Sequence, residues 1–275
     1  MSPTARPTRP PRTRPSGCSG RSACSATPPG VSQFGPVEKA TYDDWDWQID
    51  VNLKGMINGV QTFMPRMIAN GGGHIVNTAS MSAFVALPTT AIYCTTKYAV
   101  RGLSESLRIE LDKYNIGVSV LCPGGVNTNI HESVLARPEK YGQTGYYGAD
   151  PEVFKRLKSV IEGGFDPVDL GRVVLRAVER NDFWILPYPE FIPTVEKNTE
   201  EVIAAMQMYE DDPDYARRRK AARGAGQGHA RRPLIARRRR LPRTGRDPRE
   251  MPIAPAPRFR ASSQASNGRG ATSPH

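Results

Sequence analysis

The spacing of hydrophobic residues predicts two long helices in the middle of the chain. Between residues 45 and 67, apolar side chains recur three or four positions apart, which is the pattern of an amphipathic helix. Just before this segment, Thr41 and Asp44 have the spacing of a capping box, in which each side chain accepts a hydrogen bond from the other residue's backbone. A second amphipathic segment predicts a helix from residue 93 to about residue 114.

Two short apolar segments alternate with these helices and predict buried strands. Residues 74–79 and 116–122 are nearly continuous in hydrophobic character, as strands of a parallel sheet are. Helices and strands in alternation favour an α/β fold with a parallel sheet covered by helices. Ligands of such folds bind beyond the carboxyl ends of the strands, where Ser80 and residues 123–128 lie. Other patterns predict helices at 151–161, 167–180 and 194–209, and a last strand at 183–186.

The two ends of the chain lack this periodicity. Residues 1–30 hold five arginines and no acidic residue, and residues 216–275 hold seventeen basic residues against two acidic ones. Such segments bury too little apolar surface to offset the entropy lost on ordering, so both are predicted to be disordered. The predicted globular domain, residues 31–215, has twenty-five acidic and sixteen basic residues, although the whole chain carries a net charge of +11.

Cysteine usage and hydropathy indicate the cellular compartment of the protein. Of the four cysteines, Cys94 and Cys122 fall in helical or apolar segments, and no group of residues has metal-ligand spacing. A reduced, cytoplasmic protein without a metal is the simplest interpretation. No apolar run reaches the roughly eighteen residues of a membrane span, and the first residues lack the apolar centre of a secretory signal. No membrane partner is therefore predicted.

Tyr93 and Lys97 are the residues with the clearest chemistry. They lie four positions apart in a predicted helix, so their side chains share one face. An ammonium near a phenol favours the phenolate, so Lys97 is expected to lower the pKa of Tyr93 from about 10 towards the range of a general acid/base. Ser80 ends the preceding strand. On its spacing alone, Asn52 is interpreted as a polar residue on the solvated face of its helix.

Four motifs, in order and in register, resemble the short-chain dehydrogenase/reductase family over residues 31–191. Asn52 lies in the segment Asp-Val-Asn-Leu-Lys-Gly at 50–55, and Ser80 precedes Tyr93 by thirteen residues. Tyr93 and Lys97 form the family's Tyr-x-x-x-Lys signature. The segment Cys-Pro-Gly-Gly-Val-Asn-Thr at 122–128 is similar to the segment that closes over the nicotinamide in the family. The resemblance implies a Rossmann-like parallel sheet with flanking helices.

The resemblance also implies a role for each of these residues. Tyr93 would be the general acid/base, and Ser80 would polarise the substrate carbonyl or hydroxyl. Lys97 would lower the pKa of Tyr93 and hold the cofactor ribose, and Asn52 would order a water molecule. Besides Tyr93 and Lys97, the residues expected to contact the cofactor are Pro123, Gly124, Val126 and Thr128.

The implied activity is that of an oxidoreductase that uses NAD or NADP. Hydride would pass between the nicotinamide and a small-molecule alcohol or ketone, while the protein provides orientation and electrostatics. Family members commonly assemble as dimers or tetramers through helices equivalent to residues 42–69 and 93–114, so a homodimer or homotetramer is expected. Neither the substrate nor the choice between the two cofactors can be read from the motifs.

One part of the family pattern is not found in this sequence. Members begin with a strand, a T-G-x-x-x-G-x-G turn and a helix, in a first βαβαβ half of about ninety residues. Residues 1–30 carry no such turn. We therefore expect an N-terminally incomplete member with impaired cofactor binding. Both ends have the composition of GC-rich DNA translated in a shifted reading frame, a hypothesis that the upstream DNA sequence tests.

Two alternatives stay open at this point. The chain could instead be a non-catalytic interaction module whose basic ends bind nucleic acid or another partner. The arginine-rich end disfavours nucleic acid, because Phe259 is the only aromatic residue after Tyr215. The loop at residues 127–150 is either a substrate lid or an insertion without function.

Overall fold

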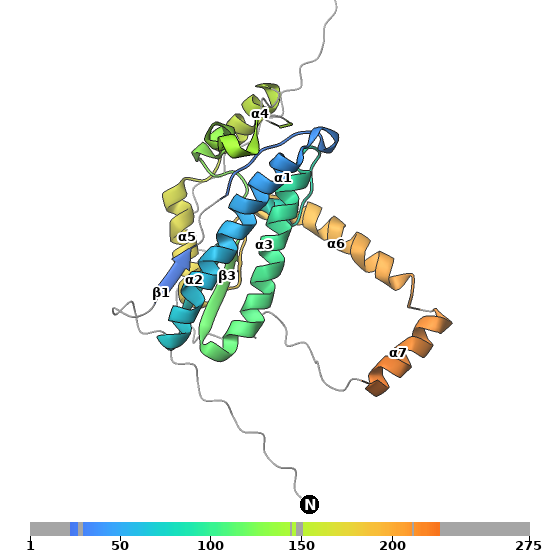
Figure 1. Cartoon of the computed structure of the whole chain (residues 1–275). Helices are drawn as coiled ribbons and strands as arrows, with labels where there is room; N and C mark the ends of the chain where they lie inside the picture. Colours follow the sequence, from blue (N-terminus) through green and yellow to red (C-terminus); the bar gives the residue numbers. More distant parts are fainter. Residues whose placement is uncertain (1–22, 27–29, 144, 147–150, 211, 226–275) are drawn as a thin grey trace, which may run out of the picture. The chain divides into compact units, whose positions relative to one another are not determined.

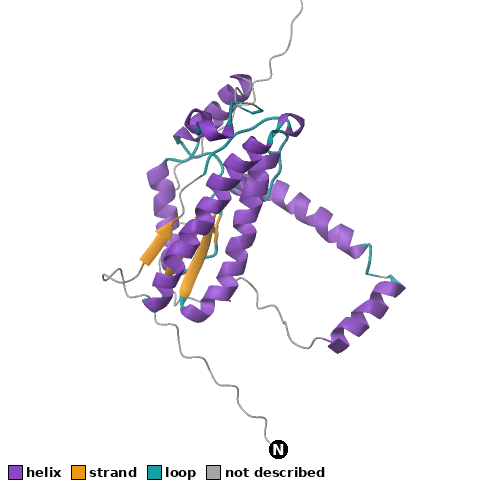
Figure 2. Cartoon of the chain, in the orientation of Figure 1, coloured by secondary structure: helices purple, strands orange, loops and turns teal. Residues whose placement is uncertain are grey.

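The computed structural model describes residues 23–26, 30–143, 145–146, 151–210 and 212–225. These residues form an α/β fold around a single parallel sheet, with long helices packed along it (Figure 1). Figure 2 shows strands beside and between the two helices at residues 42–69 and 91–110. Every pair of neighbouring strands is parallel, which confirms the predicted fold class. In spatial and in sequence order the strands are β1 (Ala23–Ala26), β2 (Gly73–Thr78), β3 (Ile116–Leu121) and β4 (Trp184–Ile185).

The first predicted helix is present and is made of three successive pieces. Its capping box is confirmed, since the Thr41 hydroxyl accepts the Asp44 N–H at 3.4 Å and the Asp44 carboxylate accepts the Thr41 N–H at 2.8 Å. The middle piece is a π-helical turn, a feature that recurs at functional sites. The pieces are α1 (Tyr42–Gln48), η2 (Ile49–Lys54) and α2 (Gly55–Ala69).

The alternation of side chains along the strands divides the core into two layers. Ile75 points into a cluster that also contains residues of α2 and of α3 (Ala91–Glu110). Val76, the next residue, points into a second cluster with residues of α5 (Pro167–Arg180). The helix pair α2 and α3 therefore covers one face of the sheet, and α5 covers the other.

Strand β1 corrects the prediction that residues 1–30 are disordered. It pairs with β2 in parallel register, from Ala23 opposite Gly73 to Ala26 opposite Val76. No sequence pattern marks this strand, because a short strand at a sheet edge is held by main-chain hydrogen bonds, which leave no hydrophobic periodicity. Residues 1–22 and 27–29 lie outside the described part of the chain.

The C-terminal half contains the predicted helices and one that was not predicted. Helix α7 (Pro213–Ala225) includes residues 216–225, for which disorder was expected. The prediction was wrong there because alanine and arginine are both strong helix formers even where no core is available. The remaining part of that predicted segment, residues 226–275, is not described. The other elements after β3 are η5 (Asn129–Ala136), η6 (Glu139–Tyr141), α4 (Pro151–Glu162), η7 (Pro189–Phe191) and α6 (Ile192–Gln207).

Two kinds of feature are missing from the described residues, a membrane-spanning helix and a metal site. None of their helices combines the length and the apolar character needed to cross a bilayer. Within the same residues, no three His, Cys, Asp or Glu side chains gather where a metal ion could be held.

His74 in β2 makes folding sensitive to acid. Its ring hydrogen-bonds the Ser119 hydroxyl at 2.8 Å and lies against Gly117, where a Cβ would stand 2.3 Å from Nδ1. Burial, aided by the charge of Arg108, lowers the pKa of His74 from 6.5 to about 4. The unfolded chain therefore binds more protons than the folded chain between pH 4 and 6.5, and stability rises with pH across that window.

We predict that His74→Gln flattens this dependence. The free energy of unfolding of the wild type should rise by about 2–3 kcal/mol between pH 4 and 6.5 because of this one group. Urea titrations at half-unit pH steps measure the rise. A variant whose curve keeps the full slope would show that His74 is not the titrating group.

Candidate active site

Ser80 lies where the chain leaves β2, beside the end of β3. Backbone hydrogen bonds join the two strand ends, from Ala79 N–H to Leu121 O at 2.7 Å and from Met81 N–H to Pro123 O at 2.8 Å. The Ser80 hydroxyl accepts the N–H of Ser82 at 3.1 Å and contacts the Pro123 carbonyl at 3.5 Å. The serine is thus held at the carboxyl edge of the sheet, where ligands of this fold class bind.

Tyr93 stands in the first turn of α3 and is 8% exposed. Its ring packs edge-on against Phe34, with ring centroids 5.4 Å apart. Burial raises the pKa of Tyr93 to about 12, and a hydrogen bond with the Ser80 side chain acts in the opposite direction. The phenol is therefore protonated at neutral pH and lies in hydrogen-bond contact with Ser80.

Lys97 follows one turn later and is 2% exposed. Its Nζ donates to the Thr78 carbonyl at 3.2 Å and lies 5.5 Å from the centre of the Tyr93 ring. Burial lowers the pKa of Lys97 to about 8, so most of the side chain is still an ammonium at neutral pH. The pKa of Tyr93 is thus raised rather than lowered as expected, because burial of the phenol outweighs its hydrogen bond with Ser80.

Asn52 is buried rather than solvated, against the interpretation from its spacing. The π-helical turn carries its side chain inward, where Oδ1 accepts the Val31 N–H at 2.8 Å. Nδ2 donates to the Val31 carbonyl at 3.0 Å and to Thr96 Oγ1 at 3.1 Å. Thr96 in turn donates to the Tyr93 carbonyl at 2.8 Å. The side chain thus connects the segment before α1 to the helix that bears Tyr93.

The segment at residues 123–128 is fixed by contacts from later parts of the chain. Val126 forms an isolated bridge with Phe165, and the Gly125 carbonyl accepts the Tyr188 hydroxyl at 2.9 Å. Thr128 donates to the Val126 carbonyl at 3.3 Å. The structure therefore brings Ser80, Tyr93, Lys97, Asn52 and this segment to the same edge of the sheet. Sequence reasoning did not identify Val31, Thr96, Phe165 or Tyr188, since nothing in their spacing marks them.

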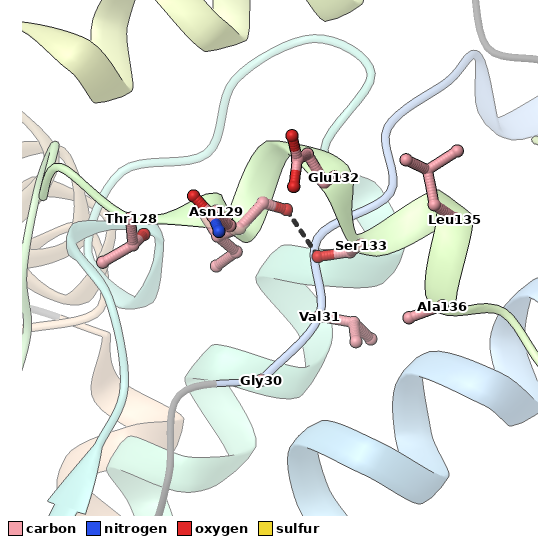
Figure 3. Close-up of a pocket in the computed structure, with 9 residues that line it drawn as sticks. Gly30, Val31, Thr128, Asn129, Glu132, Ser133, Leu135 and Ala136 are labelled. Atoms are coloured by element: carbon pink, nitrogen blue, oxygen red, sulfur yellow. Dashed lines mark hydrogen bonds between the residues drawn. The ribbon is translucent and has the colours of Figure 1, made fainter.

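A pocket of about 550 Å³ opens beside this edge (Figure 3). One wall is the chain that enters α1, and the other is the η5 segment. Thr128 is the only one of the predicted site residues that lines it. The lining residues are Gly30, Val31, Thr128, Asn129, Ile130, Glu132, Ser133, Leu135 and Ala136.

The residues of this site fit the nicotinamide end of a dinucleotide. The Thr78 carbonyl takes one of the three donors of the Lys97 ammonium, which leaves donors for ribose hydroxyls. Thr128 lines the pocket, and its hydroxyl donates to the Val126 carbonyl. The T-G-x-x-x-G-x-G turn that meets the pyrophosphate in the family is not found in the given sequence.

The chain is similar to known dehydrogenases and oxidoreductases. The family model for short chain dehydrogenases matches residues 27–139. A protein named C alpha-dehydrogenase from Sphingobium sp. strain SYK-6 is 44% identical over 191 residues, which are 69% of this chain and 62% of that protein. An uncharacterised oxidoreductase of Listeria innocua, Lin0452, is 33% identical over 147 residues, which are 51% of this chain and 58% of that protein. The chain thus spans about three fifths of the length of these curated relatives.

Solved structures are similar to this chain in sequence and in fold. The apo form of LigO from Sphingobium sp. strain SYK-6 matches with 58% identity and a TM-score of 0.58, over 75% of this chain and 67% of that chain. A short chain dehydrogenase/reductase of Burkholderia phymatum, solved in complex with NAD, matches with 29% identity and a TM-score of 0.62, over 66% of each chain. The chain belongs to the short-chain dehydrogenase/reductase family, and its sheet and helices are Rossmann-like.

Gly30 leaves the room that Asn52 occupies, and we predict that Gly30→Ala disrupts the site. An added Cβ would stand 1.7 Å from Asn52 Oδ1, so the two hydrogen bonds between Asn52 and Val31 could not form as they do. Loss of buried hydrogen bonds of this kind should lower the free energy of unfolding by about 2–4 kcal/mol. Chemical denaturation measures the loss.

Gly171 provides the matched control. It lies in α5 with nothing within 4 Å of an added Cβ, so Gly171→Ala should raise stability by about 0.5–1 kcal/mol. Equal effects of the two glycine-to-alanine changes would contradict the role assigned to Gly30.

Because Lys97 is buried, it makes the free energy of unfolding rise as the pH is raised above about 8. Its pKa falls from 10.5 unfolded to about 8 folded, so between these values the unfolded chain binds more protons and stability rises with pH. Above pH 9 the thiol of Cys122 acts oppositely, since its pKa is raised from 9.0 to about 12. We predict a gain of about 1 kcal/mol between pH 8 and 9 that is absent in Lys97→Met. Thermal unfolding at these two pH values measures it, and an unchanged gain in the variant would refute the assignment.

Proposed function

We propose that the protein is an NAD(P)-dependent oxidoreductase that interconverts an alcohol and a ketone. The observation that carries the proposal is the buried Tyr93 phenol, in hydrogen-bond contact with Ser80 and one helical turn from Lys97. Both polar side chains stand at the carboxyl edge of the parallel sheet. This is the arrangement needed to hold a substrate oxygen and to exchange a proton with it.

Each side chain has a distinct task in this proposal. The nicotinamide cofactor, when bound, supplies or accepts the hydride. Ser80 holds the substrate oxygen by a hydrogen bond, and Tyr93 delivers the proton to that oxygen during reduction. Because burial raises the pKa of Tyr93 to about 12, the phenol is in the form that donates. Oxidation requires the phenolate, which the positive charge of Lys97 stabilises as the proton leaves.

The names of the relatives suggest the kind of substrate. The similar protein from Sphingobium is called a C alpha-dehydrogenase, so we propose that the alcohol acted on here is also carried by a Cα carbon. NAD and NADP are both retained as candidates. We propose that binding of the whole cofactor is weaker than in a member with the glycine-rich turn, since the described site serves the nicotinamide end.

We also propose a homo-oligomer, either a dimer or a tetramer. The outer sides of α2 and α3 leave large apolar side chains exposed, namely Phe63, Tyr98 and Ile109. Such a surface on neighbouring helices is suited to packing against a second copy.

The proposal predicts that Tyr93→Phe strongly slows turnover while leaving the fold intact. The phenylalanine keeps the contact with the Phe34 ring but has no proton to give, so kcat/KM should fall by about 10²–10⁴-fold. The measurement is the change in reduced nicotinamide with a panel of secondary alcohols and their ketones, with NAD(H) and NADP(H) in turn.

Tyr42→Phe is the control. Tyr42 is the first residue of α1 and is 89% exposed, so its hydroxyl should not matter for turnover. Wild-type turnover by Tyr93→Phe would contradict the proposal. Turnover lost equally in both variants would mean that the effect is not specific to the phenol at residue 93.

A further inference from the structure

A fully buried ion pair, Asp44 with Arg137, lies behind the pocket. Neither side chain has any exposure to solvent. Besides Asp44, the guanidinium donates to Gln33 Oε1 at 2.9 Å and to the Tyr141 carbonyl at 2.6 Å. It also lies 5.5 Å from the centre of the Trp47 ring. One side chain thus contacts three separate parts of the chain.

The carboxylate of Asp44 also has several partners besides Arg137. It caps α1 through the Thr41 N–H, and it accepts the Tyr146 N–H at 3.2 Å. Gly145 approaches it so closely, at φ +67°, that a Cβ there would stand 2.0 Å from Asp44 Oδ2. The chain after Arg137 therefore turns around Asp44 and leaves no space beside it.

These contacts join the two walls of the pocket. Arg137 directly follows η5, which forms one wall in Figure 3, and Gln33 follows Gly30 and Val31 in the other. The Ser32 N–H also donates to the Ser133 hydroxyl at 3.2 Å, in a buried hydrogen bond. The walls are thus held together at two places, by this hydrogen bond and by the contact of Arg137 with Gln33.

A second contact anchors the same loop to the helix that carries Asn52. The Tyr141 hydroxyl donates to Asp50 Oδ2 at 2.6 Å, two residues before Asn52. Asp50 also pairs with Lys54, and these two interactions hold its pKa below the ordinary value. The loop between Arg137 and Tyr146 is therefore fastened to the long helix at both α1 and η2.

Stability alone does not account for a buried pair of this kind. Removing two charges from water costs free energy that their attraction only partly returns. Apolar side chains in place of a buried ion pair often stabilise a fold as well as the pair does. A guanidinium instead offers donors in a fixed planar arrangement, which sets the relative positions of its acceptors. Here the acceptors are Gln33, which follows one pocket wall, Asp44 in α1 and Tyr141 in the loop, while Arg137 itself directly follows the other wall, η5.

We infer that Arg137 is a positioning residue that sets the distance between the two walls of the pocket and so its fit to a nicotinamide nucleotide. The inference about the ligand rests on the proposed function, whereas the positioning of the walls does not. Under this inference, the described residues 137–143 and 145–146 of the loop support the pocket. That role differs from both earlier interpretations of the loop, a substrate lid and an insertion without function.

The test compares Arg137→Met with the wild type by hydrogen exchange. In the variant, the amides of residues 30–33 and 129–136 should exchange at least about tenfold faster, while those of β2 and β3 keep their rates. Arg180→Met is the control, because Arg180 makes an exposed pair with Asp182 away from the pocket. It should leave all of these rates unchanged. A uniform increase, or none at 129–136, would overturn the inference.

Binding of nicotinamide mononucleotide and of NADH to the same proteins completes the test. Titration calorimetry should show dissociation constants about tenfold larger for Arg137→Met than for the wild type. Equal affinities in the two proteins would overturn the inference about the ligand even if exchange were faster. If the wild type bound neither probe, the proposed function would fail, and the exchange rates alone would decide on the positioning of the walls.

Discussion

The side-chain amide of Asn52 is the contact on which the arrangement of the site depends. Both of its N–H donors are used, one by the Val31 carbonyl and one by Thr96, and its oxygen accepts the Val31 N–H. No acid or hydroxyl side chain has this combination of donors and acceptor. The π-helical turn brings the amide inward, and Gly30 leaves the space that it fills. Through Thr96, the same contact reaches the first turns of α3 and the backbone of Tyr93.

Burial then decides the protonation states of the chemical groups. The pKa of Tyr93 rises to about 12 and that of Lys97 falls to about 8, so burial favours the neutral form of both. At neutral pH the site holds a neutral phenol beside an ammonium. That state suits donation of a proton to a carbonyl oxygen. Oxidation of an alcohol, the reverse direction, needs the positive charge of Lys97 to stabilise the phenolate. Because the pKa of Lys97 is about 8, a bound ligand can change how far this side chain is protonated.

The sequence was informative wherever chemistry leaves a periodic or local pattern. The long helices, the capping box at Thr41 and the parallel strands follow from spacing and composition, and the family follows from four motifs in register. Contacts between distant segments leave no such pattern. Strand β1 is held by backbone pairing, and Arg137 meets Asp44 across ninety-three residues. The pKa of Tyr93 was misjudged for a related reason, since spacing places Lys97 nearby but does not report how deeply the phenol is buried.

The central claim is that Tyr93 is a buried proton donor in contact with Ser80 and near Lys97. Its most direct test is the pKa of this one phenol, followed by NMR of protein labelled at the tyrosine ring carbon that bears the hydroxyl. The Tyr93→Phe spectrum identifies the signal. A titration of the wild type that places the pKa near 12 agrees with the account. A phenol that titrates at or below the ordinary value of about 10 in the ligand-free protein would contradict it.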